Sequence, residues 1–153
     1  MRKSIPIAIS LTLGLLMLAN IAISQHAGHD QARPGPTVKT LMSQPMQETI
    51  DGKPAQATML EVVWEPGESS PPHRHPCPTL VYVLEGEIET QIGDGPVQRF
   101  QAGDTFYEPT MALHAKTRNP SKDQPARVLA IQIHDRGIKN LVIPESPRSS
   151  KKN

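Results

Sequence analysis

Short β-branched and apolar segments alternate with Pro- and Gly-containing turns along the chain, and this alternation constrains the fold more than any other feature. Turn signals such as Pro66-Gly67 and the stretch 93–96 separate the segments. The segments recur at roughly ten-residue spacing with no convincing amphipathic helix among them, which predicts an all-β sandwich or barrel. The expected strands lie within residues 57–67, 79–86, 87–93, 97–104, 105–109, 113–117, 126–134 and 140–144.

The length and charge of the chain narrow the possibilities further. The 153 residues give room for one domain with a hydrophobic core, and not comfortably for two. The 16 Pro and 10 Gly are spread along the sequence without a repeat, as turn residues of a β-rich domain are. A formal net charge of +1 argues against general electrostatic capture of nucleic acid.

The N-terminus has the parts of an export signal. Arg2 and Lys3 form a basic start, and residues 5–24 are a continuous apolar run. Ala22 and Ser24 place small residues at the −3 and −1 positions of a cleavage site. We predict a signal peptide that is cleaved, a periplasmic or secreted protein, and no stable membrane association afterwards. The alternative is an uncleaved anchor, because the apolar run approaches the length that spans a bilayer.

The predicted domain organisation is a signal peptide over residues 1–24, a flexible linker over 25–36, a folded domain over 37–144 and a disordered tail over 145–153. The linker and the tail are polar and aperiodic, which is typical of segments without a packed core. Cys77 is the only cysteine, so the domain has no internal disulfide and depends on its core for stability.

Three histidines are candidates for a metal site. His73 and His75 are separated by one residue, a spacing that puts both imidazoles on one face of a strand. His114 lies in another strand candidate farther along the chain. Three imidazoles that converge inside a small barrel suit a divalent transition metal with open positions for water or substrate.

These histidines lie in two spaced motifs. The first reads Gly67, five residues, His73-Arg74-His75, three residues, Thr79, six residues, Gly86. The second reads Gly103, five residues, Pro109-Thr110-Met111, two residues, His114, three residues, Arg118 and then Asn119. The pair resembles the motifs of the cupin family, G-x5-H-x-H-x3/4-E-x6-G and G-x5-P-x-G-x2-H-x3-N. The resemblance covers residues 57–134 and implies a single-domain cupin jelly-roll β-barrel with His73, His75 and His114 as metal ligands.

Three positions depart from the family pattern. Thr79 replaces the glutamate ligand, Met111 replaces a turn glycine, and Arg118 replaces the asparagine, with Asn119 one place late. The change at Thr79 matters most, because a neutral hydroxyl is a poor ligand for a divalent ion and the site loses a negative charge.

Several residues are alternatives for completing the altered site. Thr79 is a candidate hydrogen-bonding group to a metal-bound water or to substrate. Glu108 either replaces the missing acid or faces solvent, and Cys77 is either a thiol ligand or a small residue that fills a turn. Tyr107 is a candidate to reach the cavity, whereas we expect His134 to be a surface residue at a strand end. The larger apolar side chains are expected to fill the barrel or an oligomer face: Trp64, Tyr82, Val83, Phe100 and Phe106.

The resemblance also implies a range of functions. A three-histidine site without the acid is similar to that of the thiol dioxygenases, in which substrate binds the metal and supplies the missing charge. The leading hypothesis is an exported metalloprotein with one Fe, Mn, Ni, Cu or Zn ion, a dioxygenase-like oxidoreductase on a small organic substrate. The alternatives are a non-catalytic cupin that binds a small molecule or metal, and an isomerase or sugar-processing enzyme. Small cupins are often dimeric, so we expect a homodimer.

Overall fold

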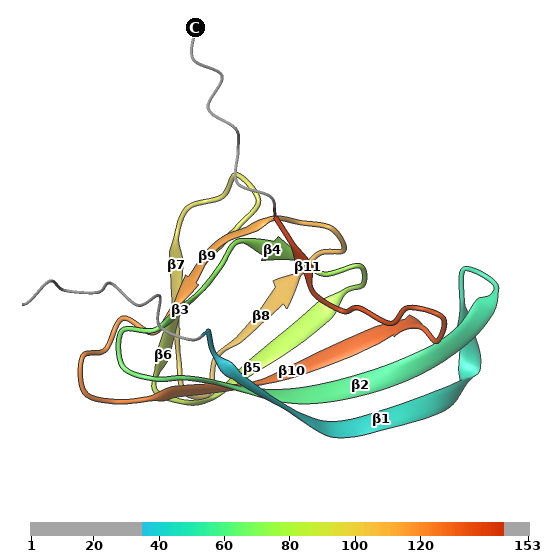
Figure 1. The fold of residues 1–153 in the computed structure, drawn as a ribbon, viewed down its shortest axis with the longest axis horizontal. Helices are drawn as coiled ribbons and strands as arrows, with labels where there is room; N and C mark the ends of the chain where they lie inside the picture. Colours follow the sequence, from blue (N-terminus) through green and yellow to red (C-terminus); the bar gives the residue numbers. More distant parts are fainter. Residues whose placement is uncertain (1–34, 146–153) are drawn as a thin grey trace, which may run out of the picture. The chain divides into compact units, whose positions relative to one another are not determined.

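Strands account for all the regular secondary structure that the computed structural model describes, which covers residues 35–145 (Figure 1). The predicted all-β class is confirmed. In chain order the strands are β1 (Thr37–Ile50), β2 (Lys53–Trp64), β3 (Ser69–Ser70), β4 (His73–Arg74), β5 (Thr79–Glu85), β6 (Glu87–Ile92), β7 (Gln98–Gln101), β8 (Thr105–Glu108), β9 (His114–Arg118), β10 (Ala126–Asp135) and β11 (Ile143–Pro144).

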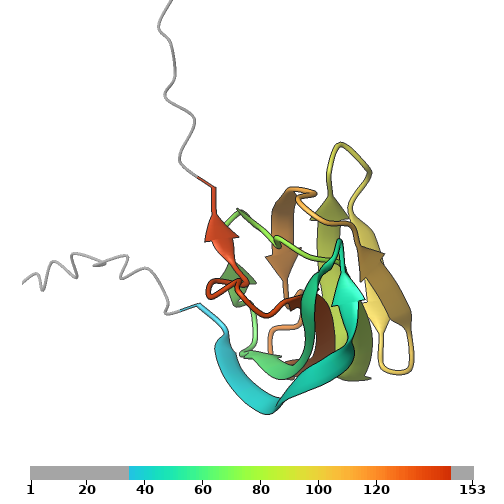
Figure 2. The ribbon, with the colours of Figure 1, turned by 90° about the vertical axis from the view of Figure 1, so that its right-hand side faces the viewer.

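The strands form two antiparallel sheets. One has the order β1-β2-β10-β5-β8, and the other has the order β11-β4-β9-β6-β7, with β3 also paired to β9. Figure 2 shows the two sheets curving around a shared interior. Neighbours in space are often distant in sequence, and β10 lies between β2 and β5. This arrangement is the double-stranded β-helix, or jelly roll.

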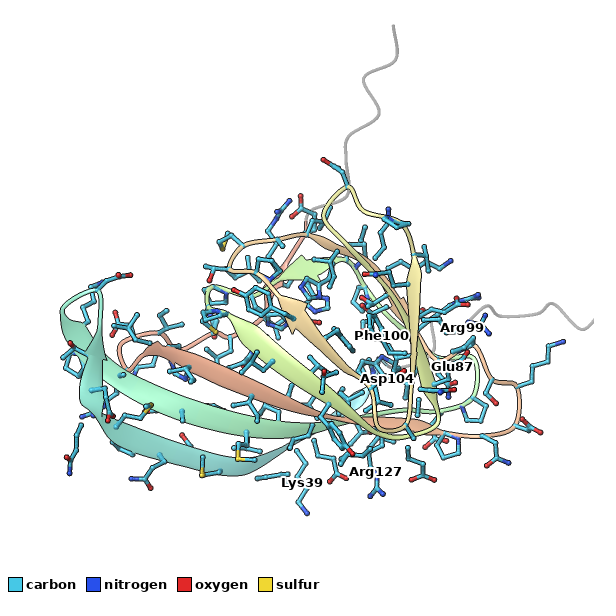
Figure 3. All side chains as sticks on the ribbon, turned by 180° about the vertical axis from the view of Figure 1, so that it is seen from behind. Lys39, Glu87, Arg99, Phe100, Asp104 and Arg127 are labelled. Atoms are coloured by element: carbon cyan, nitrogen blue, oxygen red, sulfur yellow. The ribbon has the colours of Figure 1, made fainter. Side chains whose placement is uncertain are left out.

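Alternation along the strands decides which side chains enter the barrel. In β10 every second side chain from Ala126 to His134 is buried, which is the period-2 pattern of a strand with one face on a core. The core cluster comprises Trp64, Val81, Val83, Ile88, Ala126, Val128 and Ala130, and the stacked rings of Phe100 and Phe106 pack against it. Lys39 and Arg127 project from the opposite, outer face of the same sheet (Figure 3).

Two motif positions have clear structural reasons. Gly86 turns the chain from β5 into β6 with a φ of 70°, and a Cβ there would lie 2.3 Å from the carbonyl oxygen of Pro125. Only glycine fits such a close approach. Asn119 is buried, and its Nδ2 donates to the carbonyls of Trp64 and Gln124 at 3.2 and 2.8 Å. Asn119, which follows β9, therefore links that point of the chain to the last residue of β2 and to the loop before β10.

The longest strand was not among the sequence-based expectations. The run of β1, from Thr37 to Ile50, mixes polar and apolar residues without a regular alternation, and nearly every side chain in it is exposed. It forms because it pairs along its length with β2, through a hairpin at Asp51-Gly52 whose residues both have positive φ. The strand predicted at 57–67 begins and ends earlier in the structure, at Lys53 and Trp64, and the strand predicted at 140–144 is limited to the two residues of β11.

Within the described residues, no helix is long and apolar enough to cross a membrane. The predicted signal peptide, almost all of the predicted linker and nearly all of the predicted tail lie outside the part of the chain that the structure describes. Those predictions remain untested.

Candidate metal centre

The pairing of β4 with β9 brings the two histidine motifs together. His73 in β4 lies directly opposite His114, the first residue of β9, in the antiparallel register. His75 follows β4, where the chain leaves the sheet toward β5. The one-residue spacing of His73 and His75 thus brings both side chains to the site from a strand of only two residues, β4, which pairs with β9 and β11.

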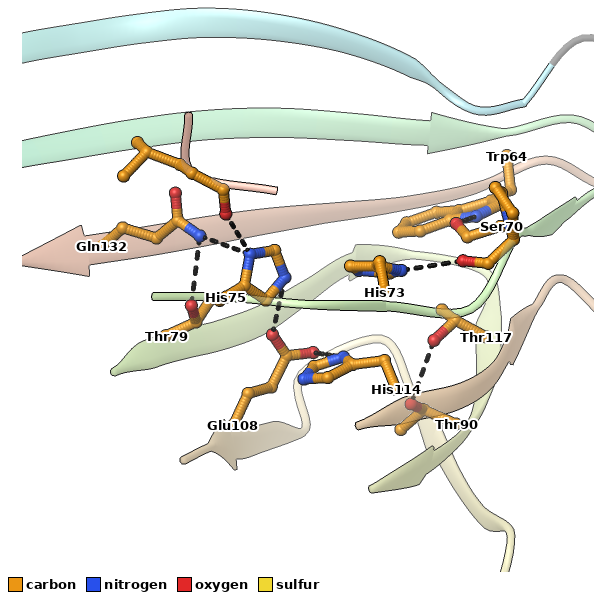
Figure 4. A network of polar contacts seen from close by, with 12 residues as sticks. Trp64, Ser70, His73, His75, Thr79, Thr90, Glu108, His114, Thr117 and Gln132 are labelled. Atoms are coloured by element: carbon orange, nitrogen blue, oxygen red, sulfur yellow. Dashed lines mark hydrogen bonds and ion pairs between the residues drawn. The ribbon is translucent and has the colours of Figure 1, made fainter. Parts of the chain in front are cut away.

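The three imidazoles form a compact cluster (Figure 4). Each pair of ring centroids is 5.0 Å apart, for His73 with His75, His73 with His114, and His75 with His114. One potential ligand atom from each residue lies within 4.8 Å of the others, a grouping that could hold a metal ion.

Hydrogen bonds prepare two of these rings for coordination. His73 Nδ1 donates to the carbonyl oxygen of Pro71 at 2.9 Å, and His75 Nδ1 donates to that of Leu141 at 2.6 Å. A ring that donates through Nδ1 keeps a lone pair on Nε2, as a metal ligand must. Burial, with the neighbouring imidazoles, lowers the pKa of His73, which favours the neutral form that binds metals.

The third ring, that of His114, carries a buried nitrogen without a partner in the described part of the chain. Nε2 of His114 is buried and has no hydrogen-bond partner among the described residues. A buried polar atom without a partner destabilises the fold by roughly 1–3 kcal/mol, and a ligand bound to this nitrogen would remove that penalty. The donor set of three imidazoles fits a divalent transition metal.

Glu108 joins the cluster from β8. Its side chain is buried, which excludes the solvent-facing alternative left open by the sequence. Oε2 lies 3.4 Å from His75 Nε2, and Oε1 lies 3.2 Å from His114 Nδ1. The last residue of β8 therefore places a carboxylate among the histidines.

Gln132 is a member of the site that the motifs did not indicate. It is fully buried on β10, and its amide nitrogen lies 3.0 Å from His75 Nδ1 and 3.1 Å from Thr79 Oγ1. Its Oε1 has no partner among the residues that the structure describes. Because His75 Nδ1 already carries a proton, the amide oxygen suits that contact better than the nitrogen. In either orientation, one polar atom of the amide has no partner within residues 35–145. The alternation of β10 could have identified Gln132 as an inward residue.

The remaining candidates lie away from the cluster. Cys77 is buried and is not part of the three-histidine grouping; burial and the charge of Glu108 raise the pKa of its thiol to about 11, so it is protonated at neutral pH. Tyr107 is 52% exposed and does not line the cavity. The expectation of a surface His134 was wrong, because the inward phase of β10 buries it against Thr58, whose hydroxyl is 3.0 Å away.

A cavity of about 260 Å³ opens beside the histidines. The histidines, Glu108, Thr79 and Gln132 provide its polar side. Most of the rest is apolar, including Leu60, Val62, Trp64, Val81, Phe106 and Val128. Among the described residues that line this cavity there is no Lys or Arg. The cavity can thus hold an apolar body while presenting a few polar groups at one place.

Comparison with known proteins shows what the domain is similar to. Residues 60–132 match the family model Cupin_2, described as a cupin domain. No curated protein matches the sequence.

Solved structures share the fold at low sequence identity. A Klebsiella pneumoniae protein with a double-stranded β-helix domain is 17% identical, with a TM-score of 0.56 over 74% of this chain and 88% of that one. KdgF from Halomonas sp. is 22% identical, with a TM-score of 0.53 over 69% of this chain and 85% of its own. The DMSP lyase DddQ from Ruegeria pomeroyi is 22% identical, with a TM-score of 0.57 over 75% of this chain, which spans 54% of DddQ. The match over residues 60–132 and the shared double-stranded β-helix fold make this part of the chain similar to cupin domains.

Proposed function

We propose that this cupin binds one divalent transition metal through His73, His75 and His114 and uses it on a small organic molecule. The observation that carries the proposal is the convergence of three imidazoles at a cavity, with a buried His114 nitrogen that lacks a partner within residues 35–145. Nitrogen donors of this kind suit Fe, Mn, Ni, Cu or Zn. When bound, the metal would supply Lewis-acid or redox chemistry to a substrate beside it.

The protein's own part in that chemistry is orientation and exclusion of water. The carbonyls of Pro71 and Leu141 fix the rings of His73 and His75. Gln132 and Thr79 offer hydrogen bonds to a polar group of the substrate on the same side of the cavity. The apolar walls hold the remainder of the molecule away from water.

The cavity narrows the class of substrate. Its volume of about 260 Å³ exceeds the roughly 150 Å³ that suffices for benzene, so it fits about one substituted ring or a branched molecule of that size. With no Lys or Arg among the described lining residues, an anionic group would have to bind at the metal. Walls with few hydrogen-bonding groups suit a sugar poorly, which argues against the sugar-processing alternative.

For the reaction, we propose a dioxygenase-like oxidation, because a metal held by the three histidines beside the apolar cavity would supply redox chemistry to a substrate there. The second candidate is a non-catalytic binding protein, which the apolar walls equally favour. Oxygen consumption with phenols, diketones and thiols separates the two. An isomerase or a lyase, the activity named for DddQ, would instead act under anaerobic conditions.

The metal content of purified protein tests the proposal. We expect one ion per chain in the wild type and none in His75→Ala. His134→Ala is the matched control, because it removes a buried histidine outside the cluster and should keep the ion. Thr79→Ala should only weaken binding; a loss equal to that of His75→Ala would make Thr79 a ligand. A wild-type protein that takes up no Fe, Mn, Ni, Cu or Zn would show the proposal to be wrong.

A further inference from the structure

We propose that Glu108 is the acidic metal ligand of this protein, supplied from β8 in place of the acid that β5 lacks at Thr79. The inference rests on the proposed metal site and specifies its fourth protein ligand.

The register of β5 and β8 gives the first argument. Thr79 and Glu108 are direct partners in the antiparallel ladder, and both side chains are buried on the inner face. Side chains directly opposite each other on one face have Cβ atoms about 4.5–5.5 Å apart. A carboxylate at residue 108 can therefore reach the region that a carboxylate at residue 79 would occupy.

The contact with His75 gives the second argument. Because His75 donates through Nδ1 to the Leu141 carbonyl, its neutral ring has only a lone pair at Nε2. That nitrogen faces Glu108 Oε2 at 3.4 Å, longer than the usual 2.7–3.2 Å of an N–H···O hydrogen bond. Two acceptor atoms that face each other need a proton or a metal ion between them, and 3.4 Å is long for a shared proton. Two ligands of one ion, each bonded at about 2.1 Å, lie about 3.0–3.4 Å apart.

Charge gives the third argument. The polar contacts of the Glu108 carboxylate within the described residues are the two imidazoles of His75 and His114. The described cavity lining offers no Lys or Arg to neutralise it. A buried carboxylate without a counter-charge is costly, and a divalent ion held by the same histidines supplies that charge.

This assignment changes the chemistry expected from the sequence. A divalent ion with three neutral imidazoles and one carboxylate carries a local charge of +1 rather than +2. The substrate is then not needed to supply an anionic group to the metal. An uncharged molecule becomes a suitable occupant of the apolar cavity.

The test compares the wild type with Glu108→Gln, which keeps the size and one acceptor oxygen but loses the charge. The readouts are metal affinity, from competition with a chelator, and the visible spectrum of the Co²⁺-loaded protein. We expect an affinity at least about tenfold lower and a changed spectrum. If Glu108 only oriented the imidazoles, Glu108→Gln would keep that role. A metal affinity within about twofold of the wild type, with an unchanged spectrum, would therefore overturn the assignment.

A transposed variant, Thr79→Glu with Glu108→Thr, moves the carboxylate to the facing strand. It should recover most of the affinity that Glu108→Gln loses, because the two positions face the same region. Failure of a folded double variant to recover any affinity would count against the assignment.

The wild type alone gives a further check that depends on no variant. Zn²⁺ addition should shift a carboxylate stretching band in the infrared difference spectrum, and absence of any shift would overturn the assignment. If the wild type binds no metal, the proposed function fails together with this inference. If the wild type binds metal and His75→Ala does not, but Glu108→Gln is unaffected, only the Glu108 assignment fails.

Discussion

At the scale of single residues, the site depends on side chains that the sequence separates and the strand ladder joins. The three histidines could be predicted, because their spacing to fixed glycines and prolines is local information. Glu108 and Gln132 could not be assigned in the same way. Their places follow from the pairing of β8 with β5 and of β5 with β10, which no short pattern specifies.

Met111 is a strained residue next to the site. It has a φ of 60°, the left-handed region in which the family motif has glycine, and its N–H donates to the His75 carbonyl at 2.8 Å. Left-handed backbone costs a residue with a side chain about 1–2 kcal/mol, while glycine adds about 0.5–1 kcal/mol of unfolded-state entropy. We therefore predict that Met111→Gly stabilises the protein by about 0.5–1 kcal/mol in chemical denaturation.

Ala112→Gly is the matched control for that substitution, since it adds the same flexibility where no positive φ is relieved. It should destabilise the protein by about 0.5–1 kcal/mol. If Met111→Gly destabilised the protein as much as this control does, the strain argument would be wrong.

At the scale of elements, the turn between β5 and β6 is fixed by one close contact. A side chain at Gly86 would meet the Pro125 carbonyl at 2.3 Å, and the turn also needs positive φ. We predict that Gly86→Ala lowers the free energy of unfolding by about 3 kcal/mol or more, measured by urea denaturation. Gly93→Ala is the control: its φ is 59° but no atom lies within 4 Å of the added Cβ, so about 1 kcal/mol is expected. If Gly86→Ala and Gly93→Ala lowered the free energy of unfolding equally, the Pro125 contact would not be what requires glycine at residue 86.

A charge cluster joins three strands of the second sheet. Glu89 in β6 accepts hydrogen bonds from Arg118 in β9 at 2.7 Å and from Arg99 in β7 at 2.6 Å. The arginines, Arg118 above all, lower the pKa of Glu89. Arg118, which departs from the family motif, thus has a structural role in this chain.

The sign of its pH dependence follows from that lowered pKa. A carboxylate whose folded pKa lies below its unfolded value stabilises the fold above the unfolded pKa, about 4.3 for Glu. The contribution is lost as the pH falls through the folded pKa. We predict that the wild type melts at a higher temperature than Glu89→Gln at pH 7, and that the difference closes below about pH 4. A difference that stayed constant down to low pH would contradict a charge-based contribution.

Element prediction from sequence succeeded where alternation or turn chemistry was strong and failed where pairing alone decided. The segment 126–134 reads as a strand and is one, whereas β1 mixes polar and apolar residues without alternation and is recognisable only from its partner β2. His134 was misplaced because a polar residue at a strand end was taken as exposed, although the period of its strand points it inward.

At the scale of the whole molecule, the expected homodimer stays a prediction. Exposed apolar side chains gather on the outer face of the first sheet, on β5 and its neighbour β8, where Leu80, Tyr82, Leu84 and Tyr107 are 39–52% exposed. Apolar patches of this kind often mark protein contacts. We expect a dimer by light scattering at micromolar concentration, and a shift toward monomer in Leu80→Lys. Val97→Lys, at an exposed apolar position outside β5 and β8, should leave the dimer intact. A monomeric wild type would contradict the expectation.

The export prediction also belongs to this scale and rests on residues 1–24 alone. Fractionation of cells that make the full chain would test it. Recovery of a shortened chain from the periplasm or medium is the expected result, and a full-length chain retained in the membrane would indicate the uncleaved alternative.

We propose that three histidines and a transposed glutamate hold one metal ion at the side of an apolar cavity. A crystal structure of the metal-loaded protein, with anomalous diffraction at the metal edge, tests it most directly. We predict one ion per chain, with nitrogens of His73, His75 and His114 and an oxygen of Glu108 within about 2.0–2.2 Å. Absence of an ion among the histidines would show the metal site to be wrong, and an ion there with the Glu108 carboxylate turned away would show the Glu108 assignment to be wrong.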